Sequence, residues 1–358
     1  MPNRRDFLFQ AGAAGILAAT SLSAKTLASR RAAGIVQTVR GPIDASSLGV
    51  TLPHEHICVS SAGFWQEWPE YFGGRAKFAA SVAGKLRLAK DMGVTTIVDV
   101  TPADVGRDIR LLAEVSRQSG MHIIACTGHW LYPSLSMAAR STEELTDYFM
   151  LEITRGIEGT AIRPGVIKVA TDHEGVTPFI EKALRAAARA SRQSGIPVTT
   201  HTYAADRVGE KQADIFESEG LDPRMVCLGH CDDSDDLDYL LGLAKRGYTL
   251  GMDHMTWGAE EVTVSHAEIL SWQRRTENVK KLIDAGYGKQ LFLSNDWYFG
   301  IAIAPTGSMA VKEKMNPDGL LFTSRKTVPY LRKLGVSDQA IRQLTVENPK
   351  RFFGGNEG

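Results

Sequence analysis

Short apolar runs alternate with longer amphipathic stretches along most of the chain. Runs rich in β-branched and aliphatic residues recur between positions 49 and 296, about one every 35 residues, which is the size of a strand–helix unit. Their nearly continuous apolar content is typical of strands that are buried on both faces, as in a parallel sheet. The eight runs cover residues 49–52, 95–100, 123–126, 165–170, 197–201, 225–230, 248–254 and 291–296.

The stretches between these runs carry the period of an α-helix. Residues 179–194 and 234–246 place apolar side chains three or four positions apart, and glycines such as Gly120 and Gly195 stand where helices should end. Eight strands that alternate with helices favour an α/β fold of the (β/α)8 or TIM-barrel type, with one catalytic domain over residues 31–358. A doubly wound open sheet is the alternative, but no Gly-x-Gly-x-x-Gly turn follows the first strand.

The first 30 residues predict an export signal rather than a part of the barrel. Arg4 and Arg5 precede a mildly apolar run over residues 11–24, which is typical of a twin-arginine signal peptide. That run is shorter than the roughly 20 residues of a membrane span. We therefore expect a periplasmic protein without a membrane span, and peripheral association with the membrane stays open. An amphipathic first helix of the fold is the alternative interpretation.

The composition favours a small-molecule partner. The 358 residues carry 41 Lys and Arg against 41 Asp and Glu, so the chain lacks the excess positive charge of most nucleic-acid-binding proteins. With 43% hydrophobic residues, the chain can also fold around a core without disulfides. We expect its cysteines to be buried thiols: Cys58, Cys126, Cys227 and Cys231.

Candidate metal ligands follow the apolar runs directly. In a TIM barrel, the residues at the carboxyl ends of the strands meet at one face, where catalysis takes place. His54 and His56 point to the same side of an extended strand, so they can share one ion. Imidazole and carboxylate suit Zn²⁺, and also Mn²⁺, Fe²⁺ or Co²⁺. Histidines satisfied by hydrogen bonds alone are the alternative. The other residues at these ends are Lys168, His201, His230, Asp253, His254 and Asp296.

Lys168 is unusual among these residues, because a protonated amine would repel metal ions. A buried lysine loses its charge readily, and a neutral amine can add carbon dioxide to form a carbamate. The carbamate is anionic and can bridge two cations about 3.5–4 Å apart. The alternative is a structural lysine paired with a carboxylate.

Several segments resemble the bacterial phosphotriesterases, also called aryldialkylphosphatases, organophosphate hydrolases or parathion hydrolases, of the amidohydrolase superfamily. The resemblance runs over nearly the whole chain after the signal. It is carried by residues 39–43, 52–58, 60–64, 167–171, 198–202, 229–233, 293–297 and 316–319.

The resemblance implies a binuclear metal centre. Two divalent ions, by default zinc, would be bridged by carboxylated Lys168 and a hydroxide. Asp296, His254 and Asp233 would relay a proton to solvent. The substrate pocket would contain Trp130, Trp257, Tyr298 and Ile301. The ligands would be His54, His56 and Asp296 at the more buried ion and His201 and His230 at the more exposed one.

The resemblance also implies the reaction and the assembly. The bridging hydroxide would attack the phosphorus of a neutral phosphotriester such as paraoxon or parathion and release an alcohol or a phenol. A homodimer is expected, with the aromatic segment 64–72 at its interface. Packing of that segment on its own barrel is the alternative.

The substrate loops depart from the family pattern. Trp257 stands where the familiar members have His, Ile301 where they have Phe, Ala304 near their Tyr, and Val59 in place of Gly. These departures leave a second enzymatic hypothesis open, in which the same metal core acts mainly as a lactonase or carboxylesterase. A third hypothesis is a non-enzymatic periplasmic binding protein, because a fold alone does not define a function.

Overall fold

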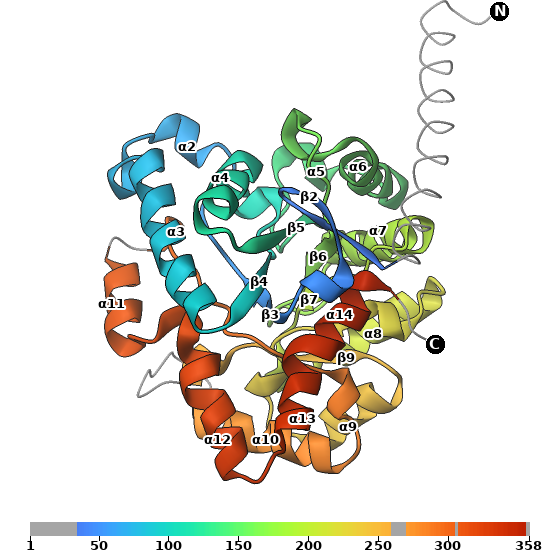
Figure 1. Ribbon diagram of the computed structural model, residues 1–358. Coiled ribbons are helices and arrows are strands. Elements are labelled where there is room, and N and C mark those ends of the chain that lie inside the picture. Colours follow the sequence, from blue (N-terminus) through green and yellow to red (C-terminus); the bar gives the residue numbers. More distant parts are fainter. Residues whose placement is uncertain (1–33, 259–269, 305–306, 356–358) are drawn as a thin grey trace, which may run out of the picture.

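The computed structural model describes residues 34–258, 270–304 and 307–355, and its centre is a barrel of eight parallel strands (Figure 1). The strands follow one another in chain order around the sheet, each hydrogen-bonded to the next, and helices surround them. This arrangement confirms the predicted TIM barrel. The strands are β3 (Val50–Glu55), β4 (Val94–Asp99), β5 (His122–Gly128), β6 (Val166–Ala170), β7 (Val198–His201), β8 (Val226–Leu228), β9 (Thr249–Met252) and β10 (Leu291–Leu293).

The helices form where local signals and an apolar face agree. In α7, Thr177 accepts a hydrogen bond from the backbone N–H of Ile180, Pro178 occupies the first turn, and Gly195 ends the helix in the left-handed conformation. The helices are α2 (Phe64–Glu67), α3 (Arg75–Asp91), α4 (Ile109–Ser119), α5 (Leu135–Ala138), α6 (Thr142–Arg155), α7 (Pro178–Ser194), α8 (Val208–Ser218), α9 (Leu237–Lys245), α10 (Trp272–Asp284), α11 (Ser308–Met315), α12 (Val328–Lys333), α13 (Asp338–Arg342) and α14 (Asn348–Gly354).

Glu55 joins the first and last barrel strands. β3 and β10 are the two ends of the hydrogen-bonded sheet. The buried carboxylate of Glu55 accepts hydrogen bonds from Ser294 Oγ (2.8 Å), Asn295 N (3.0 Å) and Trp297 N (2.7 Å). Burial raises the pKa of Glu55 to about 8, although these donors act in the opposite direction. Glu55 thus reinforces with its side chain a closure that two backbone hydrogen bonds also make, from Asp296 N to the His54 carbonyl and from His56 N to the Trp297 carbonyl.

A short hairpin covers the amino-terminal end of the barrel, and the sequence pattern did not predict it. It consists of β1 (Ile35–Thr38) and β2 (Gly41–Asp44), which pair in antiparallel register. The backbone N–H of Val39, in its turn, donates to the carbonyl of Ile123 near the start of β5. Figure 1 shows the hairpin in blue across this end of the barrel.

Three strands end two or three residues earlier than the sequence predicted. The predicted runs 225–230, 248–254 and 291–296 extend beyond β8, β9 and β10. His230 (φ 58°) and Asp296 (φ 47°) lie just past their strands in the left-handed conformation, which turns the backbone out of the sheet. The polar residues of these three runs, His230, Asp253, His254 and Asp296, therefore stand at the start of the loops rather than on the strands.

The cysteines, the aromatic segment and the signal peptide are the remaining predictions. All four cysteines are buried and free, as expected. Phe64 and Trp65 of the aromatic segment pack on the barrel, whereas Trp68 is 58% exposed, so the predicted dimer stays a prediction. Residues 1–30, the predicted signal peptide, lie outside the described residues. Within the part of the chain that the structure describes, we find no helix with the length and apolar character needed to cross a membrane.

Candidate metal centre

The six predicted metal ligands converge at the carboxyl end of the barrel. His56 Nε2 lies 3.0 Å from Asp296 Oδ1, and His54 Nε2 lies 3.8 Å from the same oxygen. These three residues form a group whose donor atoms all lie within 4.8 Å of one another, which suits a metal ion. The pKa of His54 is lowered to about 4, chiefly by burial and then by Lys168, so its imidazole is neutral and able to bind a cation at pH 7.

His201 and His230 form a second pair beside the first group. Their strands β7 and β8 are neighbours in the sheet, and His230 Nε2 lies 2.8 Å from His201 Nδ1. The rings of His54 and His230 are 4.8 Å apart between centroids, so the two groups are contiguous. Burial lowers the pKa of both His201 and His230, which keeps each imidazole neutral, with one ring nitrogen able to bind a cation.

Lys168 lies on β6 and points into the same space. Its ammonium nitrogen donates to His54 Nε2 at 2.9 Å, and only 2% of the residue is exposed. Burial lowers its pKa, as the carbamate hypothesis requires. The neighbouring strand reaches Lys168 through Gly128, where a Cβ would lie 1.9 Å from the Lys168 carbonyl oxygen. Glycine is needed there because the two backbones touch.

Asp296, His254 and Asp233 form a continuous chain of hydrogen bonds, as predicted for the relay. His254 Nε2 donates to Asp296 Oδ2 (2.9 Å), and His254 Nδ1 donates to Asp233 Oδ2 (2.7 Å). Burial would lower the pKa of His254, but the carboxylates of Asp233 and Asp296 raise it to about 10. Asp233 is in turn paired with Arg275 of α10, a buried residue that the sequence interpretation missed.

Asp253 is the most informative residue that the sequence interpretation left without a role. Its Oδ2 accepts from His54 Nδ1 and its Oδ1 accepts from His230 Nδ1, both at 2.9 Å. One buried carboxylate therefore orients a histidine from each of the two groups. Gly251 leaves room for it, because a Cβ there would lie 2.3 Å from Asp253 Oδ2. Its place directly after an apolar run was the only sequence signal.

Two further outer partners hold the remaining histidines. Thr101 Oγ1 lies 2.7 Å from His56 Nδ1. Asp172, on the loop after β6, lies 3.6 Å from His201 Nε2, and this contact lowers the pKa of Asp172 to about 2. Such partners fix the orientation and the tautomer of ligating imidazoles. The donor set of imidazoles, a carboxylate and an amine, each held from behind, thus fits divalent transition-metal ions.

The predicted substrate residues differ in how directly they contact the ligands of this centre. The ring of Trp130 is 6.0 Å from that of His201. Tyr298 pairs with His56 in a parallel bridge and lies under Lys312, whose ammonium is 3.4 Å from the ring centroid. Trp257 lies in the short 3-10 helix Met255–Gly258, and its side chain is outside the described part of the chain.

Ile301 and Val59, two of the departures from the family pattern, are neighbours. They form a parallel bridge beyond the ends of β3 and β10. Val59 N donates to the carbonyl of Gly300 at 2.9 Å, and Ala302 N donates to the carbonyl of Val59 at 2.8 Å. The two departures from the family pattern therefore lie side by side in the structure rather than at separate places.

The geometry defines a class: a TIM barrel whose strand ends carry a histidine and aspartate group suited to metal-dependent hydrolysis. The match to the phosphotriesterase family extends over residues 34–353, and the chain belongs to this family. It is a family of metal-dependent hydrolases, which agrees with the group formed by His54, His56 and Asp296.

Relatives within this family carry different names. The chain is 33% identical to an aryldialkylphosphatase from Saccharolobus solfataricus, over 87% of this chain and 96% of that protein. It is 25% identical to an N-acetyltaurine hydrolase from Dictyostelium discoideum, over 89% and 98% of the two chains. The solved phosphotriesterase from Mycobacterium tuberculosis superposes with a TM-score of 0.80 at 34% identity, over 89% of this chain and 98% of that one.

Proposed function

We propose that this enzyme hydrolyses neutral phosphotriesters such as paraoxon, using two divalent ions held by the six converging residues. One observation carries the proposal: side chains from five different strand ends meet at one point, with a buried lysine among them. We take the ions to be zinc by default and Lys168 to carry a carbamate, because its depressed pKa favours the neutral amine that reacts with carbon dioxide.

When bound, the two ions supply Lewis acidity and lower the pKa of water toward neutrality, which provides a nucleophile at pH 7. The residues of the chain then manage position and protons. Asp296 accepts the proton of the attacking water, and the neutral form of His254, with its proton on Nδ1 against Asp233, can take this proton on through Nε2, which lies 2.9 Å from Asp296 Oδ2. Asp233 holds the far side of His254 and is itself held by the buried Arg275; the partly exposed carboxylate of Asp233 is the side of this chain that reaches solvent.

The pocket chemistry favours an uncharged substrate. Trp130 beside His201 offers an aromatic wall at the more exposed half of the centre. An aromatic wall suits an aryl leaving group, and a neutral triester has no anionic oxygen that requires an arginine clamp. The released products are a phosphodiester and an alcohol or a phenol.

A lactone or a carboxylic ester is the second candidate substrate. The adjacent pair Val59 and Ile301 favours it, because Ile301 stands where familiar members have Phe and Val59 stands where they have Gly, so an aromatic contact is lost and an aliphatic side chain is added beside it. Relatives named for phosphotriester and for N-acetyltaurine hydrolysis support the view that this family changes substrate while keeping its barrel.

The comparison of kcat/KM for paraoxon and for an acyl lactone tests the proposal on protein with measured metal content. We expect paraoxon to be favoured by about tenfold or more, which corresponds to ~1.4 kcal/mol of differential transition-state stabilisation. A higher kcat/KM for the lactone would favour the second candidate substrate over phosphotriesters. Paraoxon turnover no faster than that of the free metal ion would contradict the first.

A further inference from the structure

A cavity with an unusual lining lies at the opposite end of the barrel from the candidate metal centre. It has a volume of about 520 Å³ and lies between the β1–β2 hairpin, α4 and the loop before β6. The hairpin turn is bonded to the start of β5, which places the cavity at the amino-terminal end of the strands. Three arginines line it, namely Arg40, Arg117 and Arg163.

The charges of these arginines are not balanced locally. The other lining residues are uncharged, and none of the ion pairs formed within the described residues includes Arg40, Arg117 or Arg163. Lys90 adds a further positive charge, since Lys90 and Arg40 both donate to the carbonyl of Gly120. The pKa of His122 is lowered by burial and then by the charges of Arg40 and Lys90, in keeping with a positive local potential.

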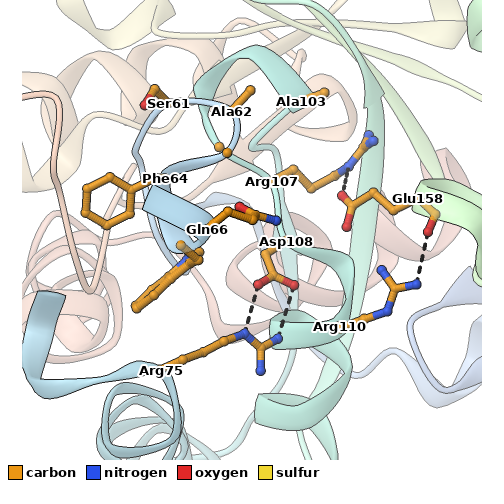
Figure 2. Close-up of a pocket in the computed structure, with 13 residues that line it drawn as sticks. Ser61, Ala62, Phe64, Gln66, Arg75, Ala103, Arg107, Asp108, Arg110 and Glu158 are labelled. Carbon is orange, nitrogen blue, oxygen red and sulfur yellow. Dashed lines mark hydrogen bonds and ion pairs between the residues drawn. The ribbon is translucent and has the colours of Figure 1, made fainter. Parts of the chain in front are cut away.

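A second surface cavity provides the contrast. It has a volume of about 630 Å³ and also contains three arginines, but two of them are neutralised (Figure 2). Arg75 pairs with Asp108 at 2.9 Å, and Arg107 pairs with Glu158 at 3.1 Å. Two of the three arginines of that cavity are thus matched with carboxylates, whereas Arg40, Arg117 and Arg163 take part in no ion pair within the described residues.

The arginines of the first cavity are also partly fixed. Arg163 Nε donates to the carbonyl of Thr154 (3.1 Å), and Arg40 is presented by a tight turn in which Thr38 Oγ1 donates to the carbonyl of Gly41 (2.7 Å). Arg163 uses Nε and Arg40 uses Nη2 to donate to a backbone carbonyl, which leaves other N–H groups of both guanidiniums for a ligand. Three cations that line one cavity raise the local concentration of anions.

We propose that this cavity binds a phosphate-bearing anion. Guanidinium groups match the oxygens of phosphate in bidentate geometry, and the cavity volume lies within the range of small-ligand sites. Val39, Pro42 and Ile162 complete the lining with apolar surface, so a phosphomonoester with an apolar part fits the cavity. The headgroup of an anionic phospholipid has the same chemistry and is the other source of such a ligand.

Calorimetric titration of inorganic phosphate into the metal-loaded full chain tests the site. We expect R117Q/R163Q to weaken one binding event at least tenfold. The control R192Q/R332Q removes two positive charges outside the cavity, and its affinity for phosphate should match that of the wild type. Phosphate bound at the metal centre is common to all three proteins and cancels in the comparison. Equal melting temperatures and equal paraoxon turnover verify that the variants are folded.

Cosedimentation with vesicles of phosphatidylglycerol, compared with phosphatidylcholine, identifies the source of the ligand. If the headgroup is the ligand, R117Q/R163Q binds phosphatidylglycerol vesicles at least tenfold more weakly than R192Q/R332Q. If a soluble phosphate compound is the ligand, the two variants differ in calorimetry alone. Wild type, R117Q/R163Q and R192Q/R332Q behaving alike in both assays would overturn the proposal.

Discussion

Two carboxylates at the centre each serve two imidazoles. Asp296 contacts His56 through one oxygen and His254 through the other, at 3.0 and 2.9 Å. Asp253 contacts His54 and His230 in the same way. Residues from opposite parts of the barrel thereby depend on one another for their orientation. The loss of a single oxygen at either carboxylate should affect more than one neighbour, because a buried imidazole N–H left without an acceptor is costly.

Asp253→Asn tests this dependence directly. The amide keeps one acceptor oxygen but places an NH2 group against the second imidazole N–H, so either His54 or His230 loses its partner. We expect the affinity for one of the two metal ions to fall by about 10- to 100-fold, the usual effect of losing such an outer contact. Competition with a chelator measures it. Asp235→Asn, at an exposed ion pair with Arg274, is the control. Unchanged affinity for both ions would contradict the assigned role.

Lys168→Ala tests the carbamate at the residue scale. Removal of the amine should abolish binuclear metal binding and activity, because the proposed bridge between the two ions is lost. A short carboxylic acid such as propionate should restore part of both, since it supplies the missing anionic oxygens. Metal content and paraoxon turnover are the readouts. Full activity without added acid would rule out the carbamate assignment.

At the scale of the elements, the first and last strands of the barrel determine where the site forms. β3 ends in Glu55, between His54 and His56, and the Glu55 carboxylate holds the segment from Ser294 to Trp297 that includes Asp296. The side chains of this segment therefore alternate. His54 and His56 point to the candidate metal centre, and Glu55 points to the junction between β3 and β10. A change at Glu55 should affect both stability and the metal group.

At a pH above the raised pKa of Glu55, Glu55→Gln should lower the free energy of unfolding by about 1–3 kcal/mol, because the NH2 group of Gln would face backbone and side-chain donors to which the ionised carboxylate offers an acceptor. Urea unfolding measures the change. Glu144→Gln, in an exposed capping box at the start of α6, is a control in which solvent replaces the lost contact. A destabilisation at Glu55 no greater than at Glu144 would show that the closure contributes little.

The predictable and unpredictable elements differ in their physical basis. The eight barrel strands could be predicted because a strand buried on both faces has few polar positions. The β1–β2 hairpin could not, because four-residue strands are too short to show a period. The strand ends were also misplaced at His230 and Asp296, since a left-handed residue leaves no distinct mark in a hydrophobic pattern.

At the scale of the whole molecule, chemistry is separated between the two ends of the barrel. The carboxyl end gathers the histidines and carboxylates, and the amino end carries the arginine cavity. The six candidate ligands could be predicted because they follow apolar runs and match a family pattern. Asp253 and Arg275 could not be assigned roles, because their partners are distant in the sequence and only the folded barrel brings them together.

The number of ions needed for activity tests the central claim most directly. Metal-free protein is titrated with Zn²⁺ in the presence of bicarbonate, and the initial rate of paraoxon hydrolysis is measured against bound zinc per chain. We predict that the rate rises to a plateau at two ions per chain, because both groups of ligands must be occupied. A plateau at one ion, or no hydrolysis with two ions bound, would contradict the binuclear phosphotriesterase centre.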